Sequence, residues 1–143
     1  MGVAVGNAMF GEPLFSASQH VRTGLAQFWS EFVATFGLLA VIWGVARRRE
    51  TAVPFAVGAY ITAYWFTAST SFANPSVTIA RAATNTFTGI RPVDVPGFIV
   101  AQCVGAAAAT ALFRWLVPAL PDVAPEVLGP HSGRAEGAGL PQE

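Results

Sequence analysis

The sequence predicts an all-α membrane protein with three transmembrane helices and one re-entrant half-helix. Of its 143 residues, 53% are hydrophobic and only 11% are charged, whereas soluble domains usually carry about 25% charged residues. Three apolar stretches approach the roughly 20 residues that a helix needs to cross a bilayer. Between the second and third stretches lies a segment too polar for a full span and too apolar for an ordinary loop.

The three stretches are expected to span the membrane at residues 25–46, 51–67 and 95–117. The second is the shortest, and Pro54 stands near its start. Together with the intervening segment, these spans form one membrane unit at residues 24–117.

The two ends of the chain differ from this unit in composition. Residues 1–23 are expected to contain the apolar stub of a preceding helix, VAVGNAMF, followed by an external loop. Residues 118–143 are rich in Pro, Gly and small polar residues and lack apolar periodicity. That composition is typical of a disordered segment, here on the cytoplasmic side.

Arginine placement predicts the orientation. Arg47, Arg48 and Arg49 lie between the first two spans, and basic clusters in short loops favour the cytoplasmic side. The third span then runs inward, which predicts a multi-pass protein of the plasma membrane with a cytoplasmic C-terminus. Net charge is zero and there is no basic patch, so nucleic acid is not an expected partner. The expected partner is the lipid bilayer.

The segment at about residues 70–88 is expected to re-enter the membrane. Asn74 is a favourable N-cap, and Pro75 suits the first helical position. The helix that follows Ser76 is expected to make about three turns before Gly89 stops it. Inside a membrane, such a half-helix can direct its free N–H groups and positive dipole end toward a pore. The alternative is a surface loop with an Asn-Pro turn.

Two ionisable residues fall within the predicted membrane unit. Glu31 lies in the first span, where a carboxylate should face the protein interior with a partner. It can accept backbone N–H groups of the re-entrant segment, or it can lie close enough to the interface to be hydrated. Arg81, on the half-helix, can line a pore vestibule or pair with protein groups at the outer surface.

The sequence contains none of the residue patterns that catalysis requires. His20 and His131 lie outside the spans, and neither has a Cys or carboxylate at metal-ligand spacing. There is no nucleophile elbow and no phosphate-binding loop. We therefore expect no enzyme activity, no cofactor and no metal site.

Residues 22–117 resemble the major intrinsic protein family, the aquaporins and glycerol facilitators. FWSEFVATFGLLAVI, with Glu31, is similar to the fourth family helix, and Asn74-Pro75-Ser76 to the second of two Asn-Pro-Ala motifs. The resemblance implies a passive channel for water or small neutral solutes, with the motif at its pore. The runs FTASTSFANPSVTIAR and TGIRPVDVPGFIVAQ are similar to bacterial members linked to arsenic resistance.

One departure from the family concerns selectivity. Water channels of the family carry an Arg directly after the motif, at the narrowest point, whereas this chain has Val77. Loss of that cation implies a wider and more apolar constriction, suited to glycerol or undissociated arsenous acid. The resemblance implies Ser71 and a position near Thr62 as further constriction residues.

A second departure concerns length. Family members have two repeats, and this chain matches only the second, which cannot enclose a pore alone. A first repeat, on a separate chain or on a preceding part of a longer protein, is then a required partner. The family also implies a homo-oligomer, commonly a tetramer. The competing hypothesis is a non-transporting membrane fragment that only packs against partner membrane proteins.

Overall fold

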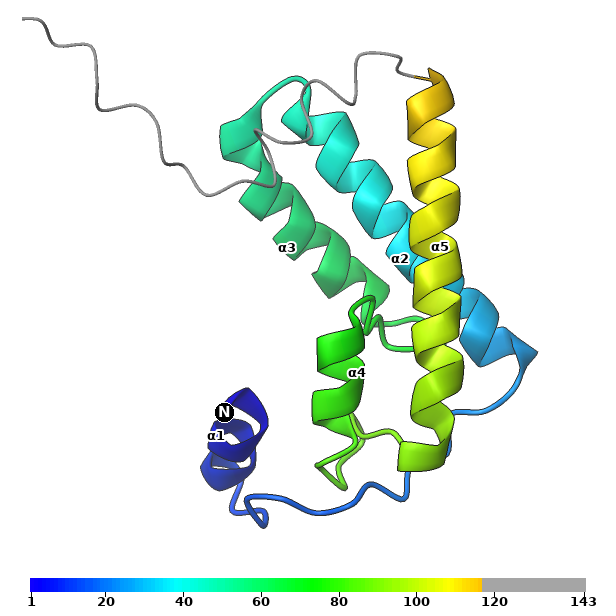
Figure 1. The fold of residues 1–143 in the computed structure, drawn as a ribbon. Coiled ribbons are helices and arrows are strands. Elements are labelled where there is room, and N and C mark those ends of the chain that lie inside the picture. Colours follow the sequence, from blue (N-terminus) through cyan, green and yellow to red (C-terminus); the bar gives the residue numbers. More distant parts are fainter. Residues whose placement is uncertain (117–143) are drawn as a thin grey trace, which may run out of the picture.

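The computed structural model describes residues 1–116, and this part of the chain is helical without strands. Its α-helices are α1 (Gly2–Met9), α2 (Leu25–Ala46), α3 (Val53–Tyr64), α4 (Pro75–Arg81) and α5 (Val95–Leu116), with short 3₁₀ helices η1 (Glu50–Ala52) and η2 (Pro92–Asp94). Helix α2 packs against α3 and α5, and α4 packs against α5 (Figure 1). The predicted tail, 118–143, lies outside the described residues.

Within residues 1–116, two helical stretches are long and apolar enough to cross a membrane. They are α2 and the stretch Pro92–Leu116, which combines η2 with α5. Both agree closely with the predicted spans 25–46 and 95–117. The pair crosses tightly at Gly105, because a Cβ atom built there would lie 2.5 Å from the carbonyl oxygen of Phe32.

The predicted span 51–67 is a shorter helix than expected. α3 has 12 residues, which is about 18 Å of helix against a hydrocarbon core of about 30 Å. It ends at Tyr64 because both the backbone N–H and the side-chain hydroxyl of Thr67 donate to the Tyr64 carbonyl, at 3.1 and 2.8 Å. The chain then turns away from the helix axis.

The half-helix is also shorter than the prediction of three turns. α4 has seven residues and ends at Arg81 rather than continuing toward Gly89. Its last carbonyls have other partners, because Ile90 N–H donates to Arg81 O, and Ser18 N–H donates to Ala82 O. These bonds replace the helical ones and turn the chain at Ala82.

The N-terminal part packs against the loop that follows α4. α1 is followed by an extended segment that runs beneath α4 toward the start of α2 (Figure 1). Asn7 of α1 is buried and accepts a hydrogen bond from the hydroxyl of Thr84 at 2.8 Å. The apolar core consists of Phe72 in the loop before α4, Ile90 in the loop after it, and Phe98 on α5.

Candidate functional site: the half-helix and its supports

The half-helix α4 begins at the Asn-Pro pair. Asn74 is extended and caps the helix, because its side-chain oxygen accepts the Ser76 N–H at 2.8 Å. Pro75 occupies the first helical turn, where a missing N–H costs nothing. Asn74, Pro75 and Ser76 are all exposed. The cap occupies only the side-chain oxygen of Asn74, which leaves its NH₂ group free for another acceptor.

The loop before α4 has an uncommon backbone conformation. Thr70, Ser71 and Ala73 have φ angles of 56°, 48° and 48°, in the left-handed region that non-glycine residues seldom adopt. Each such residue costs of order 1–3 kcal/mol and persists only where its surroundings hold it. Contacts from other elements must therefore fix this loop.

Glu31 supplies the main contact. It is fully buried on α2, and its carboxylate accepts the backbone N–H groups of Phe72, at 3.2 Å, and of Ala73. Hydrogen bonds to a charged acceptor are about twice as strong as neutral ones. The carboxylate thus holds the two residues immediately before Asn74.

Gln102 completes this buried polar cluster. Its side-chain NH₂ group donates to Glu31 Oε1 at 2.8 Å and to the Thr78 hydroxyl at 2.7 Å. The three side chains therefore connect α2, α4 and α5. Sequence reasoning missed Gln102, although an uncharged polar residue in the middle of an apolar span is a signal of such a buried partner.

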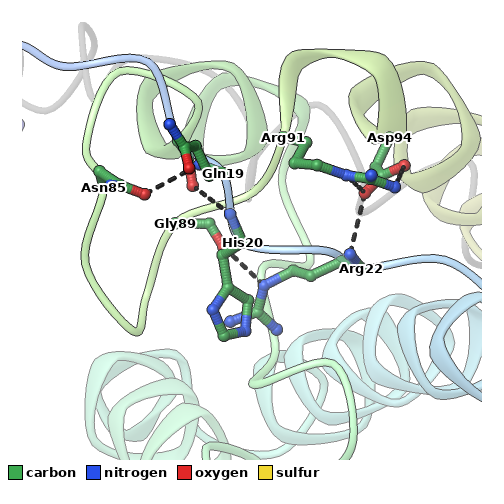
Figure 2. Close-up of polar contacts among 8 residues, drawn as sticks. Gln19, His20, Arg22, Asn85, Gly89, Arg91 and Asp94 are labelled. Carbon is green, nitrogen blue, oxygen red and sulfur yellow. Dashed lines mark hydrogen bonds and ion pairs between the residues drawn. The ribbon is translucent and has the colours of Figure 1, made fainter.

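Arg22 is a second support that sequence reasoning missed. It is 2% exposed, and its guanidinium donates to the carbonyls of Ser69, Phe87 and Gly89 at 3.2, 3.0 and 2.7 Å. Figure 2 shows it reaching Gly89 from the N-terminal segment. Burial lowers the pKa of the guanidinium, which the charge of Glu31 partly opposes. Arg22 joins the loop before α4 to the loop after it.

The N-terminal segment is fixed by further bonds on both sides of Arg22. The Arg22 N–H donates to Asp94 at 2.9 Å, and Asp94 also pairs with Arg91 at 3.1 Å (Figure 2). The Gln19 N–H donates to the side chain of Asn85 at 2.8 Å. No local pattern in the sequence indicates the bonds of Arg22 to Asp94 and of Gln19 to Asn85, since these partners lie 72 and 66 residues apart.

Val77 and Arg81 lie one turn apart on α4 and line the same cavity, of about 380 Å³. Arg81 also lines a larger cavity of about 670 Å³, together with Trp65 and Phe87. Its guanidinium carbon lies 4.3 Å from the ring centre of Phe72 and 5.3 Å from that of Trp65. Cation–π contacts of this kind hold a cation without neutralising it.

The two remaining predicted constriction residues lie on different elements and differ in exposure. Ser71 is buried in the loop before α4. Thr62 is exposed on α3, and its hydroxyl donates to the Gly58 carbonyl of its own helix at 2.8 Å. Neither lines a cavity with Val77 among the two described above.

Comparison with known proteins places this arrangement in a family. Residues 46–140 match the sequence profile described as "Major intrinsic protein". The chain belongs to this family. Its members are membrane channels rather than enzymes, and they often form oligomers, so the chain is a membrane protein and not an enzyme.

One similar curated protein is the aquaglyceroporin AqpS of Rhizobium meliloti (strain 1021). The two are 57% identical over 124 residues, which cover 85% of this chain and 53% of that protein. The chain thus spans about half the length of the curated relative it matches. No solved structure matches the chain.

Proposed function

We propose that this chain forms the second half of a passive transmembrane channel for water and small neutral solutes. A first repeat, on another chain or on a preceding part of a longer protein, closes the pore. The chain lies in the plasma membrane with its C-terminal side in the cytoplasm, as the cluster Arg47–Arg49 between α2 and α3 favours.

The observation that carries this proposal is the half-helix α4 and the way it is held. Its Asn-Pro start is exposed in this chain, while the residues just before it are fixed by the buried carboxylate of Glu31. A rigidly positioned helix start with free donors, next to helices of spanning length, is the arrangement that a membrane pore requires. Asn74 offers its NH₂ group to passing oxygen atoms, and Pro75 and Ser76 shape the same turn.

The valine at position 77 suggests that the pore admits solutes larger than water. A valine at the constriction presents a small apolar surface and no fixed donor, so it neither narrows the pore nor selects for water. Glycerol and undissociated arsenous acid are the neutral solutes we propose, with Ser71 and Thr62 as further constriction residues. The name of the relative, aquaglyceroporin, supports this class. The assembled channel is a homo-oligomer.

A chimera tests the proposal. This chain replaces the matching part of the R. meliloti relative, a substitution that 57% identity makes structurally reasonable. The chimera and this chain alone are purified, reconstituted in liposomes and compared by stopped-flow light scattering with water, glycerol and arsenous acid. We expect glycerol and water flux from the chimera and none above empty vesicles from the chain alone.

The outcome also decides between the two hypotheses. A chimera that inserts and folds but conducts neither water nor glycerol overturns the channel proposal and favours a fragment that only packs against other membrane proteins. The variant Asn74→Leu in the chimera serves as the matched negative control, because it removes both the cap and the free donors.

A further inference from the structure

The residue one turn after Val77 carries a charge that the constriction position lacks. On a helix, residues four apart lie on the same face, and Val77 and Arg81 both line the cavity of about 380 Å³. Arg81 also lines the cavity of about 670 Å³. A cation therefore lies beside the apolar constriction position without occupying it.

Aromatic rings hold this cation. Its guanidinium carbon lies 4.3 Å from the ring centre of Phe72 and 5.3 Å from that of Trp65. Phe72 directly precedes the Ala73-Asn74 turn, and Arg22 lies over the same ring at 4.9 Å. The rings fix the position of the Arg81 guanidinium next to the start of the half-helix.

No carboxylate forms an ion pair with Arg81 within residues 1–116, where Arg91 and Asp94 form the single ion pair. Glu31 accepts three N–H groups from Phe72, Ala73 and Gln102. Glu12 lines the larger cavity but forms no ion pair with Arg81. The Arg81 Nη1 atom has no hydrogen-bond partner among the described residues. The positive charge is thus left to act on the adjoining cavities.

We propose that Arg81 determines charge selectivity, excluding cations from the pore while Val77 leaves it wide for neutral solutes. This inference rests on the proposed channel function. A charge without an ion-pair partner, placed between low-dielectric walls, acts over several ångströms, and it repels cations without narrowing the passage. Size selection and charge selection, which a single Arg at the constriction would combine, are assigned here to two residues one turn apart.

The test measures the ratio of methylammonium to glycerol permeability in the chimera defined above. Arg81→Met keeps a long side chain against the rings and removes the charge, and it should raise this ratio about tenfold or more. Arg81→Lys keeps the charge and should leave cations excluded. Arg47→Met is the matched control, because Arg47 is exposed between α2 and α3 and should not change the ratio.

A second variant guards against misfolding of Arg81→Met. Ala80→Glu places a carboxylate beside Arg81, on the same cavity, and should raise the ratio while the cation–π contacts remain. If glycerol still passes and the ratio in Arg81→Met is unchanged, the inference is overturned. If Arg81→Met fails to insert, an unchanged ratio in Ala80→Glu overturns it in the same way. A parent chimera that carries no glycerol overturns the channel proposal instead.

Discussion

Glu31 and Gln102 meet at 2.8 Å between α2 and α5, and both side chains are buried. The same Gln102 nitrogen lies 2.7 Å from the hydroxyl of Thr78 on α4. A polar network of this kind is costly if any member is lost, because the remaining groups stay buried without partners. The network therefore makes the position of the half-helix dependent on α2 and α5.

Glu31→Gln should destabilise the fold. The amide keeps one acceptor oxygen, so its NH₂ group would face either the Phe72 N–H or the donors of Ala73 and Gln102, which now meet carboxylate oxygens. Loss of hydrogen bonds to a charged group costs about 1.5–3 kcal/mol. The measurement is thermal unfolding in detergent, followed by circular dichroism.

The matched control is Glu50→Gln, because Glu50 is exposed in η1. Its unfolding temperature should stay within about 1 °C of the parent, since surface substitutions change stability little. If both variants melted at the same temperature as the parent, Glu31 would not be supporting the loop.

Arg22→Lys should also destabilise the fold, although the substitution keeps the positive charge. Three carbonyls, of Ser69, Phe87 and Gly89, accept from the three guanidinium nitrogens. A lysine ammonium is a single point and cannot reach all of them. We expect a loss of about 1–3 kcal/mol, from carbonyls left unpaired in a buried site.

Limited proteolysis gives a local readout for Arg22→Lys. Cleavage within residues 82–91 should become faster, because this loop loses two of its anchors. Arg48→Lys, at an exposed site, should show the parent pattern. Equal protection of the loop in both variants would count against the anchoring role.

Gly105→Ala should weaken the packing of α2 on α5. The new methyl group would lie 2.5 Å from the backbone oxygen of Phe32, and a backbone atom cannot swing aside. Overpacking of this kind costs about 1–3 kcal/mol. Gly44→Ala is the control, since nothing lies within 4 Å of its added Cβ. If Gly105→Ala unfolded at the same temperature as Gly44→Ala, the close crossing of α2 and α5 would be contradicted.

The spans and the start of the half-helix could be predicted because their signals are local. Apolar length specifies α2 and α5, and Asn74-Pro75 specifies where α4 begins. The ends of α3 and α4 could not be predicted, because distant or side-chain hydrogen bonds terminate these helices. Thr67 ends α3, and the N–H groups of Ser18 and Ile90 take the carbonyls at the end of α4.

The supports of the candidate site were predicted only in part. Glu31 is conspicuous as a charge in an apolar span. Gln102 is a weaker signal of the same kind that does not say which residues it meets, and Arg22 carries no local signal of its partners. Gly44, Gly58 and Gly105 all lie on apolar helices, where small residues permit close helix contact. Of these three, only Gly105 has a neighbouring helix within reach of a Cβ, and it meets backbone there, whereas Gly37 and Gly97 meet the side chains of Tyr60 and Phe28. Which glycine lies at a crossing depends on helix rotation, which composition does not fix.

Val77→Arg in the chimera should reduce glycerol flux more than water flux. An arginine here would extend into the cavity of about 380 Å³ that Val77 lines with Arg81, so it would narrow the passage and add donors that suit water. We expect glycerol flux to fall about tenfold and water flux by less, measured by light scattering in liposomes. Val77→Met adds bulk without charge and separates the two effects. Equal losses of both solutes in Val77→Arg would show that Val77 does not line the constriction.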